Sequence, residues 1–403
     1  MIDVQRLEAL RLLNVYPRRG LVIRRGEGVF LEDDRGERYL DMMSNYGVSI
    51  LGHNHPAVTA ALSEQLRTLP SLHGGFTCDV RAEAASALAA RCGGGLTKVF
   101  FANSGAEANE AALKFAVLAT GRKKFVAFRN GFHGKTLGAL SATDGAAYRA
   151  PFEPLLWDFV FIEYGNPFGL AAIDDQTAGV IIEPIQGESG VRVPPPLFLA
   201  EVGKACSAAG AVLIVDEIQT GIGRTGRFLA SSDEIPAFDI VTLGKGLAGG
   251  IPAGAVLMSE KIARAIPRKI HTSTFGGNPL AAAGILAVLS VVSEEMLSHV
   301  ERLGRIFLER LRNIDADAIL EVRGKGMMIG VEVGADGDEI LRRLQKERVL
   351  AIPAGPGVVR FLPPYIIDEN HLEIALSAFR AALSERGLRP TASIPVNGPC
   401  AAS

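Results

Sequence analysis

Nearly continuous apolar runs stand out in the middle of the chain, and each is followed by an acid or a lysine. The runs occupy residues 178–182, 211–215 and 240–243. Runs in which almost every residue is Val, Ile, Leu or Ala predict strands buried on both faces of a parallel sheet. They lead into Glu183, Asp216 and Lys245. Because ligands bind at the carboxyl ends of such strands, we expect these three side chains to share one crevice.

Other patterns of polar and apolar residues predict the rest of the fold. Residues 26–41 alternate around a turn at 33–36, which predicts a β-hairpin. Between residues 55 and 290, helical patterns alternate with short apolar strands, so we expect an α/β fold with a mainly parallel sheet. This stretch forms the predicted large domain, residues 51–290. Residues 1–50 are expected to pack with a smaller domain that follows it.

The C-terminal part of the chain predicts that smaller domain, of α+β type, at residues 291–389. Amphipathic helical patterns cover residues 293–313, 337–347 and 369–387, and strand patterns cover residues 320–323, 327–333 and 358–362. Residues 390–403 contain Pro, Ser, Asn and Ala without periodicity. We therefore expect a disordered tail there.

Composition excludes several classes of protein. Hydrophobic residues make up 48% and charged residues 21% of the 403 residues, and the net charge is -2, so neither nucleic acid nor an anionic membrane is favoured as a partner. The four cysteines lack metal-ligand spacing, and His53 and His55 have no acidic cluster beside them, so no metal site is expected. With no signal-peptide pattern and no apolar stretch of about 20 residues, we expect a cytoplasmic protein.

A lysine and an acid at the ends of buried strands suggest a particular cofactor. Lys245 lies among small residues, where an ammonium has no obvious structural role. Pyridoxal 5'-phosphate (PLP) needs a lysine that forms a Schiff base and an acid that keeps the pyridine nitrogen protonated, so that the ring can withdraw electrons. Lys245 and Asp216 are the candidates for these two roles.

A phosphate site is predicted at the start of a helix. Residues 99–115 predict a strand, a turn and a helix, with Ser104 as the N-cap and Glu107 three residues on, as in a capping box. The small residues Gly105 and Ala106 leave the backbone amides open, and such a helix N-terminus attracts phosphate. Capping boxes are common, so this motif taken alone more often marks an ordinary capped helix.

Eight motifs in one order along the chain resemble those of the class III (fold type I) aminotransferases. They occupy residues 51–56, 104–106, 130–134, 183–188, 215–221, 243–246, 272–279 and 358–364. One such motif is weak evidence, whereas eight in register over nearly the whole chain are specific. The resemblance implies the α/β fold of PLP-dependent transferases of fold type I, with a large and a small domain, and an aminotransferase activity.

The resemblance assigns a role to each cofactor-site residue. Lys245 is implied to form the Schiff base and to carry the proton between substrate and cofactor, and Asp216 to pair with the pyridine nitrogen. The other implied contacts are Gln219 with the phenolic oxygen, Phe132 stacked on the ring, His133 packed near it, and Ser104, Gly105 and Ala106 around the phosphate. Thr274 is implied to reach the phosphate from the neighbouring subunit, so a homodimer with shared active sites is expected.

Substrate residues are implied in the same way. Arg360 resembles the family's carboxylate-binding arginine, and a guanidinium suits a carboxylate because it offers two parallel hydrogen bonds. Glu188 matches the acid that pairs with this arginine when no carboxylate is bound. Such a switch would let one pocket accept an ω-amino donor and 2-oxoglutarate in turn. Tyr16 and Tyr46 match substrate-pocket tyrosines, although lone tyrosines are more often packing residues.

Within the family, the chain is similar to the acetylornithine aminotransferases. It is equally similar to relatives that act on aminoadipate semialdehyde linked to a carrier protein, which would then be a second partner. The expected reaction moves the terminal amino group of such a donor to 2-oxoglutarate and yields a semialdehyde and glutamate. Lys135 departs from the pattern, because it stands where those enzymes usually have an arginine that grips a distal carboxylate. A lysine keeps the positive charge of the arginine, but it cannot form the two parallel hydrogen bonds of a guanidinium.

Other functions stay open at this point. Lysine at position 135 also occurs in diamine (putrescine-type) aminotransferases, and a 4-aminobutyrate-type enzyme is a further alternative. An aminomutase or racemase would need no second substrate, so the pairing of Glu188 with Arg360 argues against it. An idle PLP-binding protein would have no reason to keep Lys245, Asp216 and Gln219 together.

Overall fold

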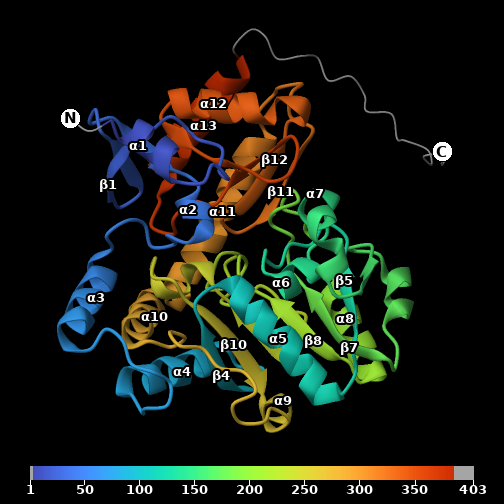
Figure 1. Cartoon of the computed structure of the whole chain (residues 1–403). Helices are drawn as coiled ribbons and strands as arrows, with labels where there is room; N and C mark the ends of the chain where they lie inside the picture. The colour runs from blue at the N-terminus through green and yellow to red at the C-terminus, as the bar shows by residue number, and fades with distance from the viewer. Residues whose placement is uncertain (1–2, 385–403) are drawn as a thin grey trace.

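The structure is a computed structural model that describes residues 3–384. The predicted tail at residues 390–403 lies outside the described residues. Figure 1 shows a large lower part built around one sheet, and an upper part that contains both the N-terminal and the C-terminal segments of the described chain.

A seven-stranded sheet forms the centre of the lower part. Its strands are β4 (Leu96–Ala102), β5 (Lys124–Phe128), β6 (Phe159–Ile162), β7 (Thr177–Ile182), β8 (Val212–Asp216), β9 (Ile240–Leu243) and β10 (Gly254–Ser259). The order across the sheet is β4-β10-β9-β8-β7-β5-β6. All neighbours are parallel except that β10 runs antiparallel to β4 and β9. The predicted mainly parallel α/β fold is therefore confirmed.

Side chains of the central strands alternate between two apolar layers. In β7, Val180 belongs to one hydrophobic cluster and Ile181 to another. The first cluster includes α8 (Phe198–Ala209) and α10 (Pro279–Val291), and the second includes α5 (Gly105–Thr120). Figure 1 shows α5 lying across one face of the sheet. A strand covered on both faces needs an apolar residue at every position, which explains the uninterrupted apolar runs in the sequence.

The upper part contains a four-stranded sheet with the order β11-β12-β15-β14, in which all neighbours are antiparallel. Its elements are β11 (Glu321–Lys325), β12 (Met328–Glu332), β14 (Ile352–Pro353), β15 (Val358–Phe361), α11 (Glu294–Arg312), α12 (Gly337–Lys346) and α13 (Glu369–Ser384). The strands and helices predicted for the smaller domain are thus present. The last three residues of the final predicted helix, 385–387, fall outside the described residues.

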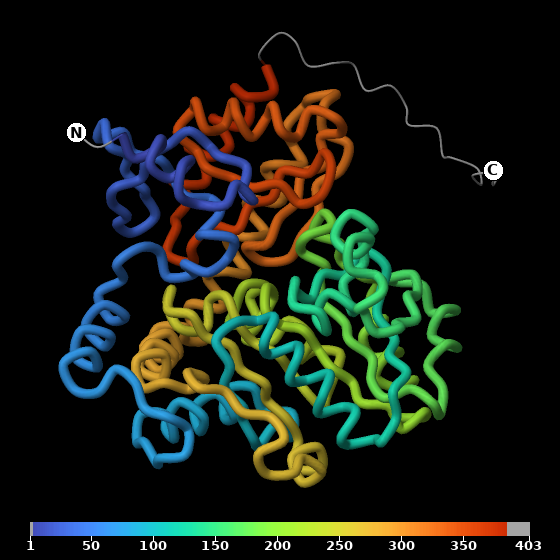
Figure 2. Tube along the Cα trace, in the orientation of Figure 1, coloured from blue at the N-terminus to red at the C-terminus, as the bar shows by residue number. Residues whose placement is uncertain are grey.

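The N-terminal segment joins this upper part through a mixed sheet. β1 (Ile23–Glu27), β2 (Phe30–Asp33) and β3 (Arg38–Asp41) are antiparallel neighbours, which confirms the predicted hairpin. β3 also pairs in parallel with β13 (Val349–Leu350). Figure 2 shows the blue N-terminal trace beside the orange and red C-terminal one. The pairing supports the proposed association of residues 1–50 with the smaller domain.

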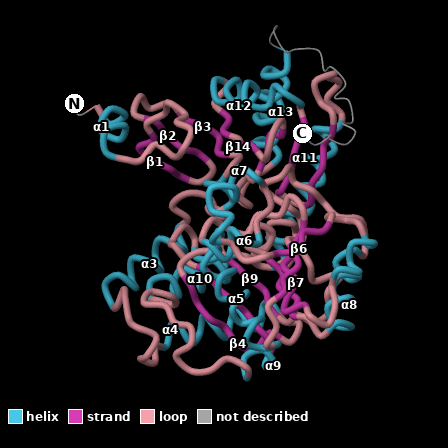
Figure 3. Tube along the Cα trace, turned by 45° about the vertical axis from the view of Figure 1, so that its right-hand side comes forward, coloured by secondary structure: helices cyan, strands magenta, loops and turns pink. Residues whose placement is uncertain are grey.

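The remaining helices complete the fold, and Figure 3 shows helices around the central strands. They are α1 (Val4–Arg11), α2 (Ser44–Gly47), α3 (Pro56–Thr68), α4 (Asp79–Cys92), α6 (Leu137–Ala142), α7 (Ala146–Arg149), α9 (Glu260–Arg264), and the 3-10 helices η1 (Ala150–Leu155), η2 (Pro167–Ala172), η3 (Lys245–Ala248) and η4 (Gly334–Asp336). In the described part of the chain, no single helix is long and apolar enough to cross a membrane. Only α10 and α11 together meet those criteria, with a 70° bend between them.

Candidate active site

Lys245 follows β9 as the first residue of η3 and is half-buried. Its φ angle of +45° is in the left-handed region, where a non-glycine residue is strained by about 1–3 kcal/mol. Such strain persists only where the surroundings enforce it. Burial lowers the pKa of the Lys245 ammonium, while attraction to Glu188 raises it in part. A lysine that gives up its proton more readily than usual can serve as a nucleophile and as a proton carrier.

Close backbone contacts place Lys245 beside the start of α5. A Cβ atom on Gly244 would lie 3.2 Å from the Cα of Gly105. A Cβ atom on Gly246 would lie 2.8 Å from the side chain of Ile50. The small residues on either side of Lys245 are therefore needed for this approach, and they bring the lysine next to the predicted phosphate site.

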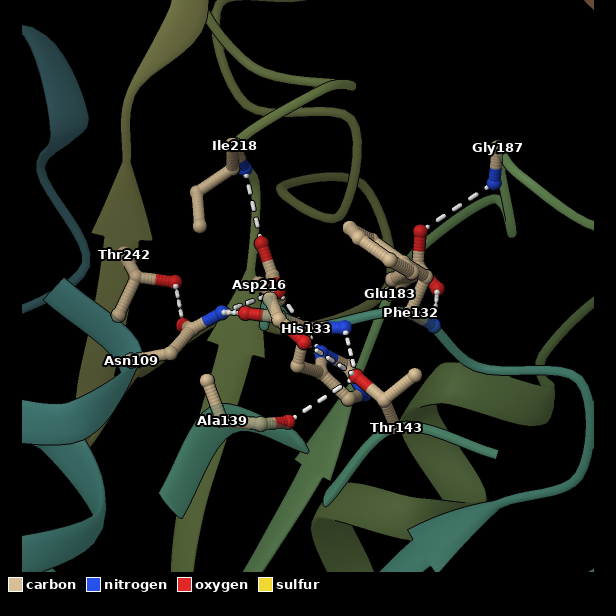
Figure 4. Close-up of polar contacts among 11 residues, drawn as sticks. Asn109, Phe132, His133, Ala139, Thr143, Glu183, Gly187, Asp216, Ile218 and Thr242 are labelled. Atoms are coloured by element: carbon tan, nitrogen blue, oxygen red, sulfur yellow. Dashed lines mark hydrogen bonds and ion pairs between the residues drawn. The ribbon is translucent and has the colours of Figure 1, made fainter. Parts of the chain in front are cut away.

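Asp216 ends β8 and is buried in a polar network, shown in Figure 4. Its Oδ2 atom accepts a hydrogen bond from Asn109 Nδ2 at 2.7 Å and lies 2.7 Å from His133 Nδ1. Its Oδ1 atom accepts a bond from the backbone N–H of Ile218 at 3.1 Å. Asn109 Oδ1 accepts in turn from Thr242 Oγ1 at 2.8 Å. The network holds the carboxylate in one orientation, as a group that keeps a proton on a ring nitrogen must be held.

His133 contacts Asp216 and is held from both sides. Its backbone N–H donates to Thr143 Oγ1 at 2.9 Å, and its carbonyl accepts from Asn109 Nδ2 at 2.8 Å. The position of His133 near the cofactor ring stays a prediction, and its imidazole contacts the acid that is proposed to bind that ring. An imidazole that donates from Nδ1 stabilises the negative charge of Asp216.

Glu183 comes directly after β7 and is also buried. Its Oε1 atom accepts from the backbone N–H of Phe132 at 2.9 Å, and its Oε2 atom accepts from the N–H of Gly187 at 3.2 Å. Burial raises the pKa of Glu183 to about 7, against a lowering influence of His133. This side chain had no predicted role beyond its place at the strand end. In the structure it fixes the backbone that carries Phe132.

The predicted phosphate site lies at the N-terminus of α5, where Ser104 is exposed. Ser104 Oγ accepts from the backbone N–H of Glu107 at 3.2 Å, as expected for the N-cap. The second half of the predicted capping box differs, because Glu107 Oε2 accepts from the N–H of Asn103 at 2.5 Å and not from that of Ser104. Gly105 and Ala106 begin the helix, and their amides have no acceptor within it. These amides are available to a phosphate.

Arg360 lies on β15 in the smaller domain and is fully buried. Its Nη1 atom donates to Glu188 Oε1 and to Gln219 Oε1, both at 2.9 Å, and its Nη2 atom donates to Pro353 O at 3.2 Å. Gln219 Nε2 donates to the same Glu188 oxygen at 3.4 Å. Burial raises the pKa of Glu188, but Arg360 and then Lys245 outweigh this and hold the pKa below its usual value. The predicted Arg360–Glu188 pair is thus present, and Gln219 joins it.

A cavity of about 780 Å³ brings the predicted substrate residues together. Its lining includes Tyr16, Tyr46, Phe132, Lys135 and Glu188. The guanidinium carbon of Arg360 lies 6.0 Å from the ring centre of Tyr46. Lys135 Nζ lies 5.0 Å from the ring centre of Tyr148, a pocket residue without a predicted role. Segments far apart in the sequence therefore form one pocket.

The polar groups of this site fit PLP. A lysine with a lowered pKa, a buried acid and an open helix N-terminus lie together, as an aldehyde, a ring nitrogen and a phosphate require. The half-buried Phe132 is the aromatic side chain next to these groups. Thr274 is exposed between α9 and α10, and no hydrogen bond joins it to the other predicted site residues in the described part of this chain.

Sequence reasoning missed several residues of the site. They are Asn109, Thr143, Tyr148, Glu183 as a structural acceptor, and Thr242. A signal existed for Thr242, which is a polar residue in an otherwise apolar run. His53, for which only a metal role was considered, has its Nε2 atom 2.8 Å from Asp41 Oδ2. Among the described residues, no group of three or more His, Cys, Asp or Glu side chains could hold a metal ion.

Comparison with known proteins agrees with this geometry. The family described as "Aminotransferase class-III" matches residues 15–383. An acetylornithine aminotransferase of Methanopyrus kandleri is 45% identical over 379 residues, which are 93% of this chain and 97% of the relative. A [LysW]-aminoadipate semialdehyde/glutamate semialdehyde transaminase of Sulfurisphaera tokodaii is 41% identical over 379 residues, or 93% and 98% of the two chains.

Solved structures show the same likeness. The ornithine aminotransferase of Toxoplasma gondii, described with PLP at its active site, superposes with a TM-score of 0.90 at 32% identity and covers 94% of this chain and 93% of its own. The acetylornithine aminotransferase of Elizabethkingia anophelis has a TM-score of 0.85 at 32% identity, with 94% and 98% covered. With matches over nearly its whole length, the chain belongs to the class-III aminotransferase family of PLP-dependent enzymes.

Proposed function

We propose that this enzyme moves the terminal amino group of an ornithine-like donor to 2-oxoglutarate and yields a semialdehyde and glutamate. The observation that carries the proposal is the Arg360–Glu188 pair with Gln219 beside it. A buried arginine already neutralised by an acid suits a donor whose reacting end has no carboxylate. When 2-oxoglutarate binds, its α-carboxylate can take the place of Glu188 on the same guanidinium. One site can then serve both halves of the reaction.

The proposed roles of the cofactor-site residues follow from their contacts. PLP, when bound, supplies an electron sink that stabilises negative charge on the substrate carbon. Lys245 is the residue that holds and moves the proton, because its lowered pKa favours the neutral amine. Asp216 keeps a proton on the ring nitrogen, and His133 and Asn109 orient it. The N-terminus of α5 binds the phosphate.

The donor is proposed from the relatives and from the pocket. The most similar relatives reported above carry names that specify acetylornithine or LysW-linked substrates, and N-acetylornithine or a carrier-linked precursor is accordingly the proposed donor. With a carrier-linked donor, the carrier protein would be a partner. A diamine donor is the second candidate, and Lys135 in place of an arginine is the observation that favours it.

We also propose a homodimer in which Thr274 completes the phosphate site of the partner. Exposed apolar side chains on the same segment support it, since Ile270 is 53% and Phe275 61% exposed. Cytoplasmic location is proposed as well. The described cysteines, Cys78, Cys92 and Cys206, are free, as thiols are in a reducing compartment.

A panel of amine donors with 2-oxoglutarate, scored by glutamate formation, tests the proposed function. We expect N-acetylornithine or ornithine to be used far better than putrescine or 4-aminobutyrate. A preference for putrescine would replace the proposal with the diamine function. Interconversion of a single amine without any glutamate formed would point to an aminomutase instead.

A further inference from the structure

The loop after β7 holds two charged side chains on one rigid backbone. Gln186 and Arg192 form a pair of backbone hydrogen bonds, each 3.0 Å long, that closes the loop between them. Glu188, the partner of Arg360, lies inside this loop. The backbone positions of Glu188 and Arg192 are therefore coupled.

The side chain of Arg192 is anchored at one end and free at the other. Its Nε atom donates to Ser189 O at 3.0 Å, and Ser189 Oγ donates to Asn130 O at 2.7 Å. Its Nη1 and Nη2 atoms have no partner among the residues that the structure describes. Arg192 also lines the 780 Å³ cavity, as Lys135 does. The cavity thus contains a guanidinium whose two terminal nitrogens are available to a ligand.

The acids that line the cavity have charged partners, whereas two of its cations do not among the described residues. Its three acids each have an arginine partner. The pairs are Glu188 with Arg360 at 2.9 Å, Asp144 with Arg129 at 3.4 Å, and Glu332 with Arg323 at 2.6 Å. Lys135 and Arg192, in contrast, contact no carboxylate within the described chain. Among the described residues, the cavity therefore presents two cations without a counter-charge.

We propose that Arg192 is a specificity-determining residue that binds the carboxylate at the non-reacting end of the donor. The inference rests on the proposed function and names the chemical class of its donor: an ω-amine that also carries a carboxylate. A guanidinium with two free nitrogens can bind that carboxylate through two parallel hydrogen bonds. Lys135 supplies a second positive charge but no fork. Arg192 thus provides the forked contact that is missing at position 135.

The same charges disfavour a diamine. The second ammonium of a diamine would enter a cavity with two unpaired cations, and like charges repel. Removing the charge of Arg192 should therefore weaken binding of a carboxylated donor and relieve that repulsion. Loss of the charge should thus weaken binding of one donor and strengthen binding of the other. A purely structural role would weaken binding of both donors.

A matched pair of donors tests this role. N-acetylputrescine is N-acetylornithine without the carboxylate. For Arg192→Gln in the PLP-loaded enzyme, we expect kcat/KM for N-acetylornithine to fall by about 10- to 100-fold, the range for a charge-assisted hydrogen bond. The value for N-acetylputrescine should stay the same or rise. Arg192→Lys should recover part of the loss, and Arg342→Gln, on the outer helix α12, should change neither donor.

A binding measurement decides the point independently of turnover. N-acetylnorvaline carries the carboxylate but no reacting amine, and its affinity, measured by calorimetry, should fall by a similar factor in Arg192→Gln. An equal loss for both donors, or unchanged affinity for N-acetylnorvaline, would overturn the role of Arg192. If the wild-type enzyme used neither donor, N-acetylornithine would be excluded as the donor and the carrier-linked precursor would remain, while the calorimetric result would still decide whether Arg192 binds a carboxylate.

Discussion

At the scale of single residues, the site depends on charged side chains that lie in buried or half-buried positions. Lys245 is a cation in a half-buried position, and its pKa is lowered for that reason. Asp216 is an anion in a buried position, held by Asn109 and His133. The sequence indicated both, because each follows an apolar run. It could not indicate Asn109 as a partner of Asp216, since the two are 107 positions apart and only the fold makes them neighbours.

Lys245→Ala should remove the visible absorbance band of the bound cofactor and reduce kcat by at least about 10²–10⁴-fold, the usual contribution of a proton-transfer group. The measurement is an absorbance spectrum before and after borohydride, with kcat alongside. Lys346→Ala, at the exposed end of α12, is the control and should behave like the wild type. If the reduced wild-type protein yielded a pyridoxyl-lysine peptide from another position, the assignment would be wrong.

Lys135→Arg should improve kcat/KM for 2-oxoglutarate and glutamate by about 5- to 100-fold, since a fork adds a charge-assisted hydrogen bond that a point charge lacks. The arginine can keep the contact with the ring of Tyr148. Steady-state kinetics with both acceptor and donor give the answer, and Lys346→Arg serves as control. Unchanged acceptor kinetics, together with inert N-acetylornithine and good use of putrescine, would favour the diamine function.

At the scale of elements, the functional side chains lie at the ends of strands and at the start of a helix. β7, β8 and β9 are adjacent and parallel, so the residues that follow them reach the same edge of the sheet. The apolar runs predicted these strands because both faces are covered. The antiparallel direction of β10 was not predictable in this way. A buried strand has the same apolar pattern in either direction, and the connection that leads to it decides which way it runs.

The free energy of unfolding should depend on pH through Glu183, which follows β7. Burial raises its pKa from 4.5 to about 7, equivalent to about 3 kcal/mol. This contribution to stability is present below the ordinary pKa and is lost as the pH rises through about 7. This loss falls mainly between the two pKa values, 4.5 and about 7, and Glu183→Gln should abolish most of it.

Thermal unfolding of the PLP-loaded enzyme across this pH range measures the effect. Glu163→Gln, an exposed position, should keep the wild-type dependence. Parallel pH profiles for wild type and Glu183→Gln would show that Glu183 is ionised in the folded protein throughout, contrary to the expectation.

At the scale of the whole molecule, the site belongs to two parts of the chain at once. Arg360 lies on the small sheet, whereas its partners Glu188 and Gln219 lie in loops of the large part. Any change in how the two parts meet would alter the distance between the carboxylate-binding and cofactor-binding ends. The proposed dimer adds a second level, because Thr274 is expected to act across subunits.

An apolar groove of about 600 Å³ near that segment gives the dimer proposal a test. Its lining includes Trp157 and Ile270, which are 41% and 53% exposed. We expect the wild type to be a dimer in sedimentation velocity. Ile270→Asp should weaken the dimer by at least about 100-fold, because it buries an unpaired charge at a cost of about 3 kcal/mol or more.

Affinity for PLP should fall together with the dimer if the subunits share the phosphate site. Ile374→Asp, which changes another exposed isoleucine, on α13, should affect neither property. A dimer of unchanged strength in Ile270→Asp would place the interface elsewhere.

The sequence by itself determined the apolar strands, the two domains' element types and the residues that end those strands, because local periodicity and buried faces leave a direct pattern in the chain. Roles for Lys245, Asp216 and Arg360 came from motifs whose spacing is local. Only the tertiary structure decided which distant residues meet. Arg192 and Lys135 are separated by 57 positions, yet they line one cavity and have no counter-charge among residues 3–384. This excess of positive charge in the cavity depends on packing, because packing decides which acid each arginine contacts. No single stretch of the sequence contains that information.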